Sequence, residues 1–405
     1  MPNLRPESEL HSDLPERTRV AIIGAGPTGL TAALALASKG IDCVIVDKSA
    51  PHAGRSRAAT VMPMSLEILE EFGVCDELVS HGLKLNGFAG WDRKRRLAAF
   101  AFAQLDTKYP YCLVIPQSLT EQLLESRLAE AGRKVHRPLE LAGFDQDQDG
   151  VVLAFTDGQT LRADYVIGAD GGHSRVREAA GIKFTGYKYP VSVVLADVDV
   201  DLDPARSGVD AAKDEDRVRG FLTPHGSMAV VPLPSGRWRI AAPMHGAVRD
   251  PDLGDVRTLI RLRAPHAIPG EVVGLEWASH FQVQRRLAER YRAGRVFLAG
   301  DAAHVHSPVA GQGMNVGIQD GANIGRKLAY VLAGGDPCTL DAYETERQEV
   351  AEKVLRATDR LTRSLMIHTR FACMVRNSVV RVVGTSTRAQ NRMAFVNSQL
   401  VYRDM

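Results

Sequence analysis

Three glycine-rich segments, far apart in the chain, constrain its fold more than any other feature. The first is Val20–Gly29, the second is Asp164–Arg177, and the third is Gly294–Asn315. A single glycine fingerprint is a weak signal, because such motifs also occur outside nucleotide-binding folds. Three of them in this order and at this spacing predict parts of one cofactor-binding site.

The first segment predicts a strand, a tight turn and a helix. Residues Val20–Ile23 are apolar and mostly β-branched, as a buried parallel strand requires. The expected helix covers residues 28–39 and ends at Gly40, a residue typical of helix C-termini. The N-terminus of this helix would offer free backbone N–H groups and the positive end of its dipole to a phosphate.

Each glycine of this segment has its own expected role. Gly24 permits the tight turn, Gly26 lets the backbone approach a pyrophosphate, and Gly29 allows close packing of helix on strand. We therefore expect the cofactor phosphates beside Gly24, Gly26, Pro27, Thr28 and Gly29. The alternative is a glycine turn that only closes a βαβ unit.

The next strand, expected over residues 42–46, ends at an acidic residue. Asp47 lies 23 positions after Gly24, close to where a ribose-binding carboxylate is expected. An acid there favours a free 2′-hydroxyl, so FAD or NAD fits better than NADP. Asp47 and its neighbour Lys48 are candidate cofactor contacts, and an incidental acidic residue is the alternative.

The second and third segments resemble a known family, the group A flavoprotein monooxygenases (para-hydroxybenzoate hydroxylase-like aromatic hydroxylases). Asp170-Gly171, with Ser174 and Arg177, resembles the Asp-Gly motif of that family, and Gly300-Asp301 resembles its Gly-Asp motif. The similarity runs from Arg19 into the C-terminal helices. It implies an α/β fold: a Rossmann-like FAD-binding domain with an inserted antiparallel β-sheet substrate domain and C-terminal helices.

The third segment also makes chemical sense without the family. A short apolar strand, Val296–Leu298, would deliver Asp301 at its carboxyl end, where ligands of α/β sheets bind. This carboxylate can accept hydrogen bonds from a ribityl chain. A helix starting near Met314 would present its positive end to the negative charge of a reduced flavin, through the backbone of Gly311, Gly313, Met314 and Asn315. The alternative is a glycine-rich loop that only packs a helix.

Further site residues are implied by the resemblance alone. Arg57 resembles the arginine that reaches the FAD pyrophosphate, with Arg55 as a rival. Gln117 resembles a glutamine that contacts the cofactor, and the backbone of Leu141 is expected to bind adenine. Asp170 and Arg177 bear on flavin and nicotinamide in the family, but a structural ion pair is an equal alternative.

The segment between residues 187 and 281 changes character and predicts an antiparallel substrate-binding sheet. Five strands are expected, at residues 191–200, 219–222, 228–233, 238–243 and 272–281, with the charged stretch 203–217 as an exposed loop. We divide the chain into a disordered tail (1–18), an FAD-binding domain (19–96, 117–186 and 282–340), the substrate-binding sheet domain (97–116 and 187–281) and a C-terminal helical region (341–405).

Apolar residues at helical spacing mark the C-terminal region. Val350, Val354, Leu361 and Leu365 would share one helix face. These helices are expected to cover the flavin domain or to mediate dimer contacts, so both a monomer and a homodimer remain open.

The pocket wall is the least defined part of the prediction. Candidates from the expected sheet are Phe221, His225, Met228, Val230, Met244, His245, His280 and Phe281, although strand alternation would place about half of them outside. Pro308 is expected near the reacting edge of the flavin. No general base can be assigned; Pro308 and His225 are weak catalytic candidates.

Composition excludes several classes. The chain has 50 basic and 48 acidic residues, a net charge of +2, which argues against a general nucleic-acid or membrane-surface role. Its five cysteines form no C-x-x-C pair and fit a reducing cytoplasm. Residues 1–17 lack the apolar core of a signal peptide. We expect a cytoplasmic protein with no metal site.

The resemblance implies an FAD-dependent monooxygenase that hydroxylates a phenolic or polycyclic aromatic substrate. NADPH or NADH would reduce the flavin and leave, since no second G-x-G-x-x-G segment is present. Dioxygen would add at flavin C4a, and the resulting hydroperoxide would transfer its distal oxygen. Three alternatives stay open: a halogenase, an epoxidase or reductase of the same fold, and a non-enzymatic flavin-binding protein.

Overall fold

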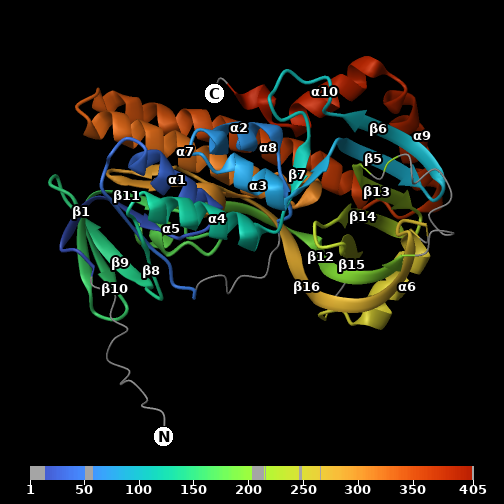
Figure 1. Cartoon of the computed structure of the whole chain (residues 1–405), viewed down its shortest axis with the longest axis horizontal. Coiled ribbons are helices and arrows are strands. Elements are labelled where there is room, and N and C mark those ends of the chain that lie inside the picture. The colour runs from blue at the N-terminus through green and yellow to red at the C-terminus, as the bar shows by residue number, and fades with distance from the viewer. Residues whose placement is uncertain are drawn as a thin grey trace, which may run out of the picture.

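The computed structural model describes residues 14–50, 58–202, 214, 216–245, 249–264 and 266–403. Two large sheets lie side by side along the long axis of the molecule, and long helices run over one side of the pair (Figure 1). Both eight-stranded sheets are assembled from distant parts of the chain. The predicted α/β class with a second, antiparallel sheet is confirmed.

The first sheet has the strand order β17-β18-β11-β1-β2-β8, and β10 and β9 extend it from β11. Its centre is parallel: β1 pairs with β2 through Val20 and Cys43, and with β11 through Val20 and Tyr165. The strands are β1 (Arg17–Ile23), β2 (Cys43–Val46), β8 (Val135–His136), β9 (Leu141–Gln146), β10 (Val151–Phe155), β11 (Thr160–Gly168), β17 (Arg292–Ala293) and β18 (Val296–Leu298).

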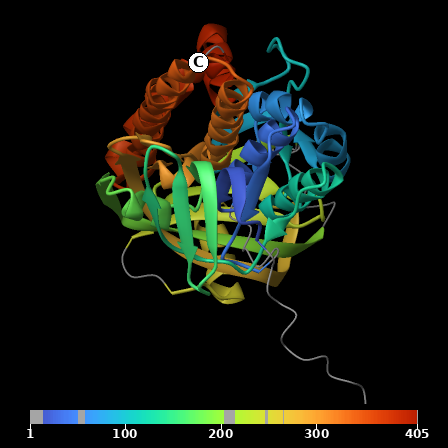
Figure 2. The same ribbon diagram turned by 90° about the vertical axis from the view of Figure 1, so that its left-hand side faces the viewer.

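Helices cover this sheet and bury its apolar strands. Seen from the end of the molecule, the strands β9–β11 stand in front of the long helices (Figure 2). The helices of this half are α1 (Pro27–Ala37), α2 (Pro63–Glu70), α3 (Cys75–His81), α4 (Gln117–Glu130), α5 (Arg175–Ala179) and α7 (Gly313–Leu332), with short 3-10 turns η3 (Gly300–Ala302) and η4 (Val309–Gly311). The strand–turn–helix–strand order predicted for the first segment is confirmed.

The second sheet has the order β19-β16-β12-β15-β14-β13-β5-β6. Its strands are β5 (Gly87–Asp92), β6 (Arg95–Ala101), β12 (Phe184–Leu202), β13 (Arg217–Thr223), β14 (Gly226–Pro232), β15 (Trp238–His245), β16 (Gly270–Ala288) and β19 (His304–Val305). A small third sheet joins β3 (Thr60–Val61), β7 (Cys112–Val114) and β4 (Leu83–Leu85). All five strands expected between residues 187 and 281 are present.

The two faces of the second sheet differ. Its outer face packs against α6 (Leu253–Arg263) in a core that includes Val256 and Leu259. Phe221, Met228 and Val230 belong to this core, so their prediction as pocket-wall residues is wrong. The alternation of side chains along a strand shows which residues share a face, but it does not show which of the two faces points to the cofactor.

Residues 97–116, assigned from the sequence to the substrate-binding sheet domain, are divided between two sheets. β6 pairs with β5 at the edge of the second sheet, whereas β7 lies in the small third sheet. Most of the charged stretch 203–217 lies outside the described residues, but Asp214 is buried and pairs with Arg96. The exact domain boundaries stay predictions.

The C-terminal helices are α8 (Asp341–Leu365), α9 (Arg370–Gly384) and α10 (Thr387–Asn397). Val350 and Val354 are buried as expected, but Leu361 is 41% exposed. The buried face of α8 continues instead through Thr358 and Thr362, whose hydroxyls donate to carbonyls one turn earlier. Apolar spacing alone could not reveal this switch.

A seam of glycines brings α7 against α1. A Cβ on Gly321 would overlap the carbonyl oxygen of Thr28, and one on Gly325 would lie 2.8 Å from the carbonyl oxygen of Ala32. Because backbone atoms cannot give way as a flexible side chain can, only glycine permits this approach. The seam holds the N-termini of both helices at the same edge of the first sheet.

We predict that Gly321→Ala destabilises the protein by about 1–3 kcal/mol, the usual cost of overpacking. Chemical denaturation followed by circular dichroism measures this. Gly143→Ala in β9 is the matched control, because a Cβ there meets nothing within 4 Å. Equal stability of the two variants would contradict close packing at the seam.

Candidate functional site

The three glycine-rich segments meet at one edge of the first sheet. Gly24 has φ of +107° and packs on the backbone of Ala169 and Asp170, which joins the first segment to the second. The Thr28 side chain lies against Gly300 and Gly317, which joins the first segment to the third. The convergence predicted from sequence is therefore present.

The N-terminus of α1 forms an open cradle. Pro27 is its first residue, and within the described part of the chain no side chain caps it and a Cβ on Gly26 would meet no atom within 4 Å. Gly29 instead packs tightly on the carbonyl oxygen of Gly24. The cradle offers backbone N–H groups and space to an anionic group.

Asp47 lies beside this cradle at the end of β2. Its carboxylate accepts hydrogen bonds from Ala25 N and Ser49 N, both at 2.7 Å. Lys48 points to Glu140, 3.7 Å away. Leu141 begins β9, and its side chain is buried in the core. Contacts of these three residues with ribose or adenine stay predictions.

Gln117 is the first residue of α4. Its side-chain Oε1 accepts from Ala58 N at 3.2 Å, and its Nε2 donates to Glu121. The structure therefore places Gln117 beside the segment that follows Arg57. Arg57 itself, with its rival Arg55, lies outside the described residues.

Asp170 and Arg177 do not form the ion pair considered from sequence. The Asp170 carboxylate accepts from Arg175 N and Val176 N at the start of α5, and burial raises its pKa. Arg177 donates to the carbonyl oxygens of Ala302 and Gly172. Arg177 thus ties the second segment to the turn that carries Asp301.

That turn follows β18 and is held by a buried carboxylate. Gly300 has φ of +60°, and its N–H donates to Asp320 Oδ2 at 3.0 Å. Asp301, next in the chain, is exposed. Its carboxylate lies beside the N-termini of α1 and α7.

The N-terminus of α7 is shaped by a loop with unusual backbone. Ala310 and Gly311 both have positive φ, 67° and 64°, and Pro308 precedes them at an exposed position. Asn315 is fully buried: its Oδ1 accepts from Met62 N at 2.7 Å, and its Nδ2 donates to Thr60 O and Gly311 O. Its side chain is thus occupied with protein, and only the backbone of Gly313, Met314 and Asn315 is offered to a ligand.

Sequence reasoning missed His306. Its ring lies against Gly313, with Cε1 3.6 Å from an ideal Cβ there, and its Nδ1 donates to Ser307 O. Burial lowers the pKa of His306 to about 4, so the ring is neutral and its buried Nε2 is an acceptor without a described partner. Its only sequence signal was its place between Asp301 and Pro308.

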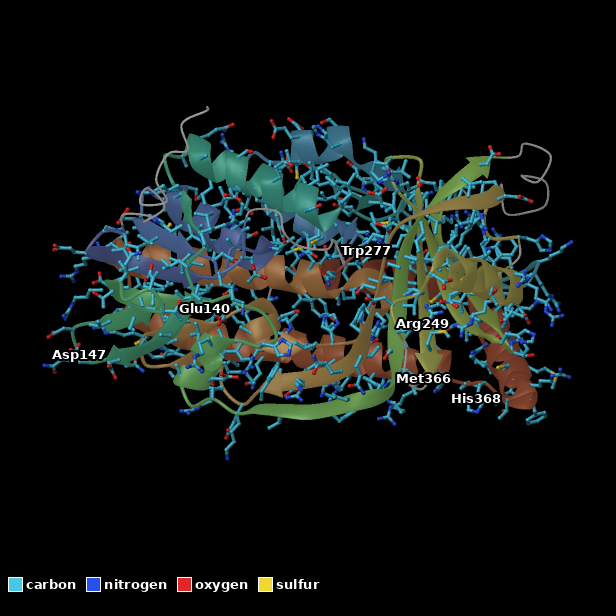
Figure 3. The ribbon with its side chains drawn as sticks, turned by 90° about the horizontal axis from the view of Figure 1, so that it is seen from below. Glu140, Asp147, Arg249, Trp277, Met366 and His368 are labelled. Carbon is cyan, nitrogen blue, oxygen red and sulfur yellow. The ribbon has the colours of Figure 1, made fainter. Side chains whose placement is uncertain are left out.

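A second missed group joins the second sheet to this site. Arg239 on the inner face of β15 pairs with Asp197 at 2.7 Å and donates to Ala58 O at 3.3 Å. Trp277, opposite Asp197 in the sheet, lies where the two halves of the molecule meet (Figure 3). Both residues were read only as strand positions in the sequence.

His225 stands apart from these groups. It is exposed in the turn between β13 and β14, so its position gives no support to a catalytic role. His280 pairs with Asp250, and the His245 ring meets the His368 ring edge-on. Phe281 packs on the inner face beside Val193 and Leu195.

The residues present fit an FAD molecule. The cradle at Gly26 suits its pyrophosphate, Asp47 and Asp301 can accept from its hydroxyls, and the α7 N-terminus can bind a carbonyl oxygen. Within the described ranges, no cluster of His, Cys, Asp or Glu suits a metal ion. The helices of those same ranges include none with the length and apolar character needed to span a bilayer.

Comparison with known proteins agrees with this geometry. Residues 17–358 match the family model described as an FAD binding domain. Rifampicin monooxygenase of Streptomyces venezuelae is 37% identical over 347 residues, which are 84% of this chain and 70% of that protein. Pentachlorophenol 4-monooxygenase of Sphingobium chlorophenolicum is 34% identical over 86% of this chain and 65% of its own length.

The solved structures include close matches in fold. OxyS anhydrotetracycline hydroxylase from Streptomyces rimosus superposes with a TM-score of 0.78 at 31% identity, covering 95% of this chain and 76% of that one. The family model spans well over half of the chain, and relatives above 30% identity align over most of it. The chain therefore belongs to the FAD binding domain family and is an FAD-dependent aromatic monooxygenase of the group A type.

Proposed function

We propose that the three converging loops hold FAD in one defined orientation. The N-terminus of α1, with Gly24, Gly26, Pro27, Thr28 and Gly29, holds the pyrophosphate. Asp47 and Lys48 face the adenosine ribose, and Asp301 accepts from the ribityl hydroxyls. The backbone of Gly311–Asn315 faces the pyrimidine edge of the flavin. The observation that carries this proposal is the meeting of the three segments, through Gly24, which packs on Ala169 and Asp170, and through Thr28, which lies against Gly300.

The remaining predicted contacts complete the binding site. Gln117, beside Ala58, reaches the cofactor from the start of α4, and Arg57 approaches the pyrophosphate from the adjoining segment. Leu141 offers its backbone to adenine. Asp170 orders the turn before α5, which Arg177 ties to Ala302.

The bound flavin supplies the redox and oxygen-activating chemistry, whereas the protein positions the ring and excludes water. The positive end of α7 stabilises negative charge on the reduced cofactor. Neutral His306 beside Gly313 adds no positive charge there. A small aromatic molecule would bind between this end and the inner face of the second sheet.

The partners follow from this arrangement. Bound FAD would supply the redox chemistry, with NADH or NADPH as a transient electron donor and dioxygen as the co-substrate for hydroxylation of an aromatic ring. We propose a cytoplasmic monomer or homodimer, without nucleic-acid or membrane partners. We favour a hydroxylase over an epoxidase, reductase or halogenase of the same fold, because relatives that align with this chain at more than 30% identity are named monooxygenases.

We predict that Asp301→Ala weakens FAD binding at least tenfold, since hydrogen bonds to a charged acceptor contribute about 1.5–3 kcal/mol. The dissociation constant is measured by titrating apoprotein with FAD and following flavin fluorescence. Asp149→Ala is the matched control, because Asp149 is exposed in the turn between β9 and β10. Full flavin loading of Asp301→Ala at limiting FAD would refute the assignment.

Pro308→Ala should increase hydrogen peroxide release per NAD(P)H consumed, because a looser loop before η4 admits water to the flavin edge. Peroxide and hydroxylated product are quantified in the same reaction. Unchanged coupling in a variant that retains its FAD would remove Pro308 from the site.

The activity itself is tested with the purified, FAD-loaded protein and a panel of phenols. A true substrate should stimulate NAD(P)H oxidation and gain one oxygen atom from ¹⁸O₂ as a ring hydroxyl, read by mass spectrometry. An epoxide, a chlorinated product in the presence of halide, or a reduced product without added oxygen would each support an alternative and overturn the hydroxylase proposal.

A further inference from the structure

A row of very small residues crosses the inner face of the second sheet. The strand register aligns Ala98 of β6 with Gly90 of β5, Gly220 of β13, Ala229 of β14 and Ala241 of β15. The side chains that alternate with them point to the α6 side and form the outer core. We call these five residues the small-residue row.

The row borders open space. All five of its members keep partial solvent access, whereas their alternating neighbours Ala89, Phe221, Val230 and Ile240 are buried. Among the residues that the structure describes, only a backbone oxygen of the same sheet lies within 4 Å of an ideal Cβ on Gly90 or Gly220, at 3.8 and 3.9 Å respectively. The inner face is therefore incompletely covered by the described helices above it.

Larger side chains bound the row on both sides. Phe88 and Phe100 stack at 5.3 Å along one border, where Val218, Val231 and Arg239 continue on the neighbouring strands. Leu222 and Ser227 stand on the other border. The Ser227 hydroxyl donates to Leu365 O at the end of α8, so the helices close this side. The result is a slot.

The slot has defined ends. Gly384 of α9 rests on Ala98, and Ala98 also lines a cavity of about 500 Å³ at the outer edge of β6. At the other end Leu195 is paired with Ala241 and packs with Met366. From Gly90 to Ala241 the slot crosses three inter-strand gaps, roughly 14 Å, which is longer than a single benzene ring.

The border of the slot formed by Val218, Val231 and Arg239 faces the segments expected to bind the cofactor. Arg239, two residues before Ala241, donates to Ala58 O. Val231, two residues after Ala229, packs in one cluster with Met62, and Met62 N donates to Asn315 at the start of α7. One long side of the row, rather than its end, therefore lies next to the proposed flavin-binding segments.

A buried cation with unused hydrogen-bonding capacity lies at the border. Arg376 of α9 is 7% exposed; its Nη1 donates to Ser364 O, and its Nε donates to Asn377. Asn377 in turn donates to Leu222 O and Asp92, which places Arg376 beside the border formed by Leu222 and Ser227. Its Nη2 is buried and has no hydrogen-bond partner among the described residues.

No ion pair joins Arg376 to an acidic side chain of the described chain, although burial opposes its charge and lowers its pKa. Asp92 lies near enough for its charge to favour the Arg376 cation, and Asn377 donates to that carboxylate, but no hydrogen bond among the described residues joins Asp92 to Arg376 directly. A buried cation without a directly bound counter-ion is costly unless something supplies one. A negatively charged oxygen entering the slot would do so.

We propose that the small-residue row and Arg376 form the specificity site of the proposed hydroxylase. It takes a planar, fused aromatic substrate of more than one ring that carries an acidic oxygen, such as a phenolate or an enolate. The rings lie across Gly90, Gly220 and Ala229, and the oxygen accepts from Arg376. This assignment rests on the proposed function, but binding tests it without turnover.

The first experiment fills the slot. Dissociation constants of 1,8-dihydroxyanthraquinone and phenol are measured by isothermal titration calorimetry on the FAD-loaded protein. Gly220→Leu should weaken anthraquinone binding by more than tenfold and change phenol binding by less than threefold, because one ring fits in the space that remains. Gly143→Leu, in open space on the first sheet, should change neither.

Ala229→Leu provides a second obstruction, so the test does not depend on the folding of one variant. FAD content and melting temperature identify folded preparations. Unchanged anthraquinone affinity in either folded variant would overturn the slot, and so would a wild-type protein that binds phenol more tightly than the three-ring probe.

The second experiment tests the cation. Arg376→Met should weaken binding of the dihydroxy probe by about ten- to a hundredfold and leave its dimethyl ether, which has no acidic oxygen, within threefold. Arg376→Lys should recover part of the affinity, because it restores the charge but not the guanidinium geometry. Equal losses for both probes would show a structural role only and would overturn the recognition of the anion.

These outcomes separate the site from the activity. If binding depends on Gly220 and Arg376 but no ring hydroxylation occurs, the slot is supported as a binding site and the proposed function is refuted. Hydroxylation of polycyclic phenols at wild-type rate by Gly220→Leu would keep the function and refute the slot.

Discussion

The buried carboxylate of Asp320 is the interaction on which the rest of the site depends. It accepts from Gly300 N at 3.0 Å, from His304 Nε2 at 2.6 Å and from Arg347 Nε at 2.6 Å. Burial alone would raise the pKa of Asp320, but Arg347 and His304 together hold it below its usual value. A buried charge is tolerated only when it is paired in this way. The three donors bind the turn after β18 and the helix α8 to α7, so Asp301 and the α7 N-terminus keep one relative position.

The two sheets differ in how closely their faces are packed, and this difference suits their different ligands. The first is packed on both faces, and glycines at Gly24, Gly29 and Gly321 let its loops approach backbone to backbone. Such packing suits a cofactor that stays bound, because its contacts must be held in place before it arrives. The second sheet has its larger core on the α6 side, and smaller clusters on the inner face leave the small-residue row partly exposed. Its inner face keeps residues with little or no side chain, which suits a substrate that must enter and leave.

The sequence was sufficient to predict those parts of the site whose function depends on the local shape of the backbone. Gly24, Gly26, Gly29 and Gly300 carry their own signal, since turns and helix N-termini are set by near neighbours. It was insufficient where the answer depends on which way a strand faces. Phe221 and Gly220 are adjacent, yet one lies in the outer core and the other on the slot. Asn315 was expected near the flavin, but only coordinates show that Met62, Thr60 and Gly311 occupy its side chain. The same holds for His306, Arg239 and Arg376, whose partners lie far away in the chain.

The arginines of the inner face differ in how they are neutralised, and this difference sets their roles. Arg239 donates two hydrogen bonds to the Asp197 carboxylate, at 2.7 and 2.8 Å, so its charge is neutralised within the protein. A further N–H of Arg239 holds Ala58 beside the proposed cofactor site. Among the described residues, Arg376 donates to two neutral acceptors, the Ser364 carbonyl and the Asn377 amide, and is favoured by the charge of Asp92 without a direct hydrogen bond to it. An arginine that already forms an ion pair is little affected by what enters the slot. An arginine without such a pair binds an anionic oxygen more strongly than a neutral group. A buried polar group that is otherwise unpaired distinguishes between two ligands more strongly than apolar contact alone does. Arg376 can therefore select aromatic ligands that carry an acidic oxygen, while the small-residue row leaves room for more than one ring.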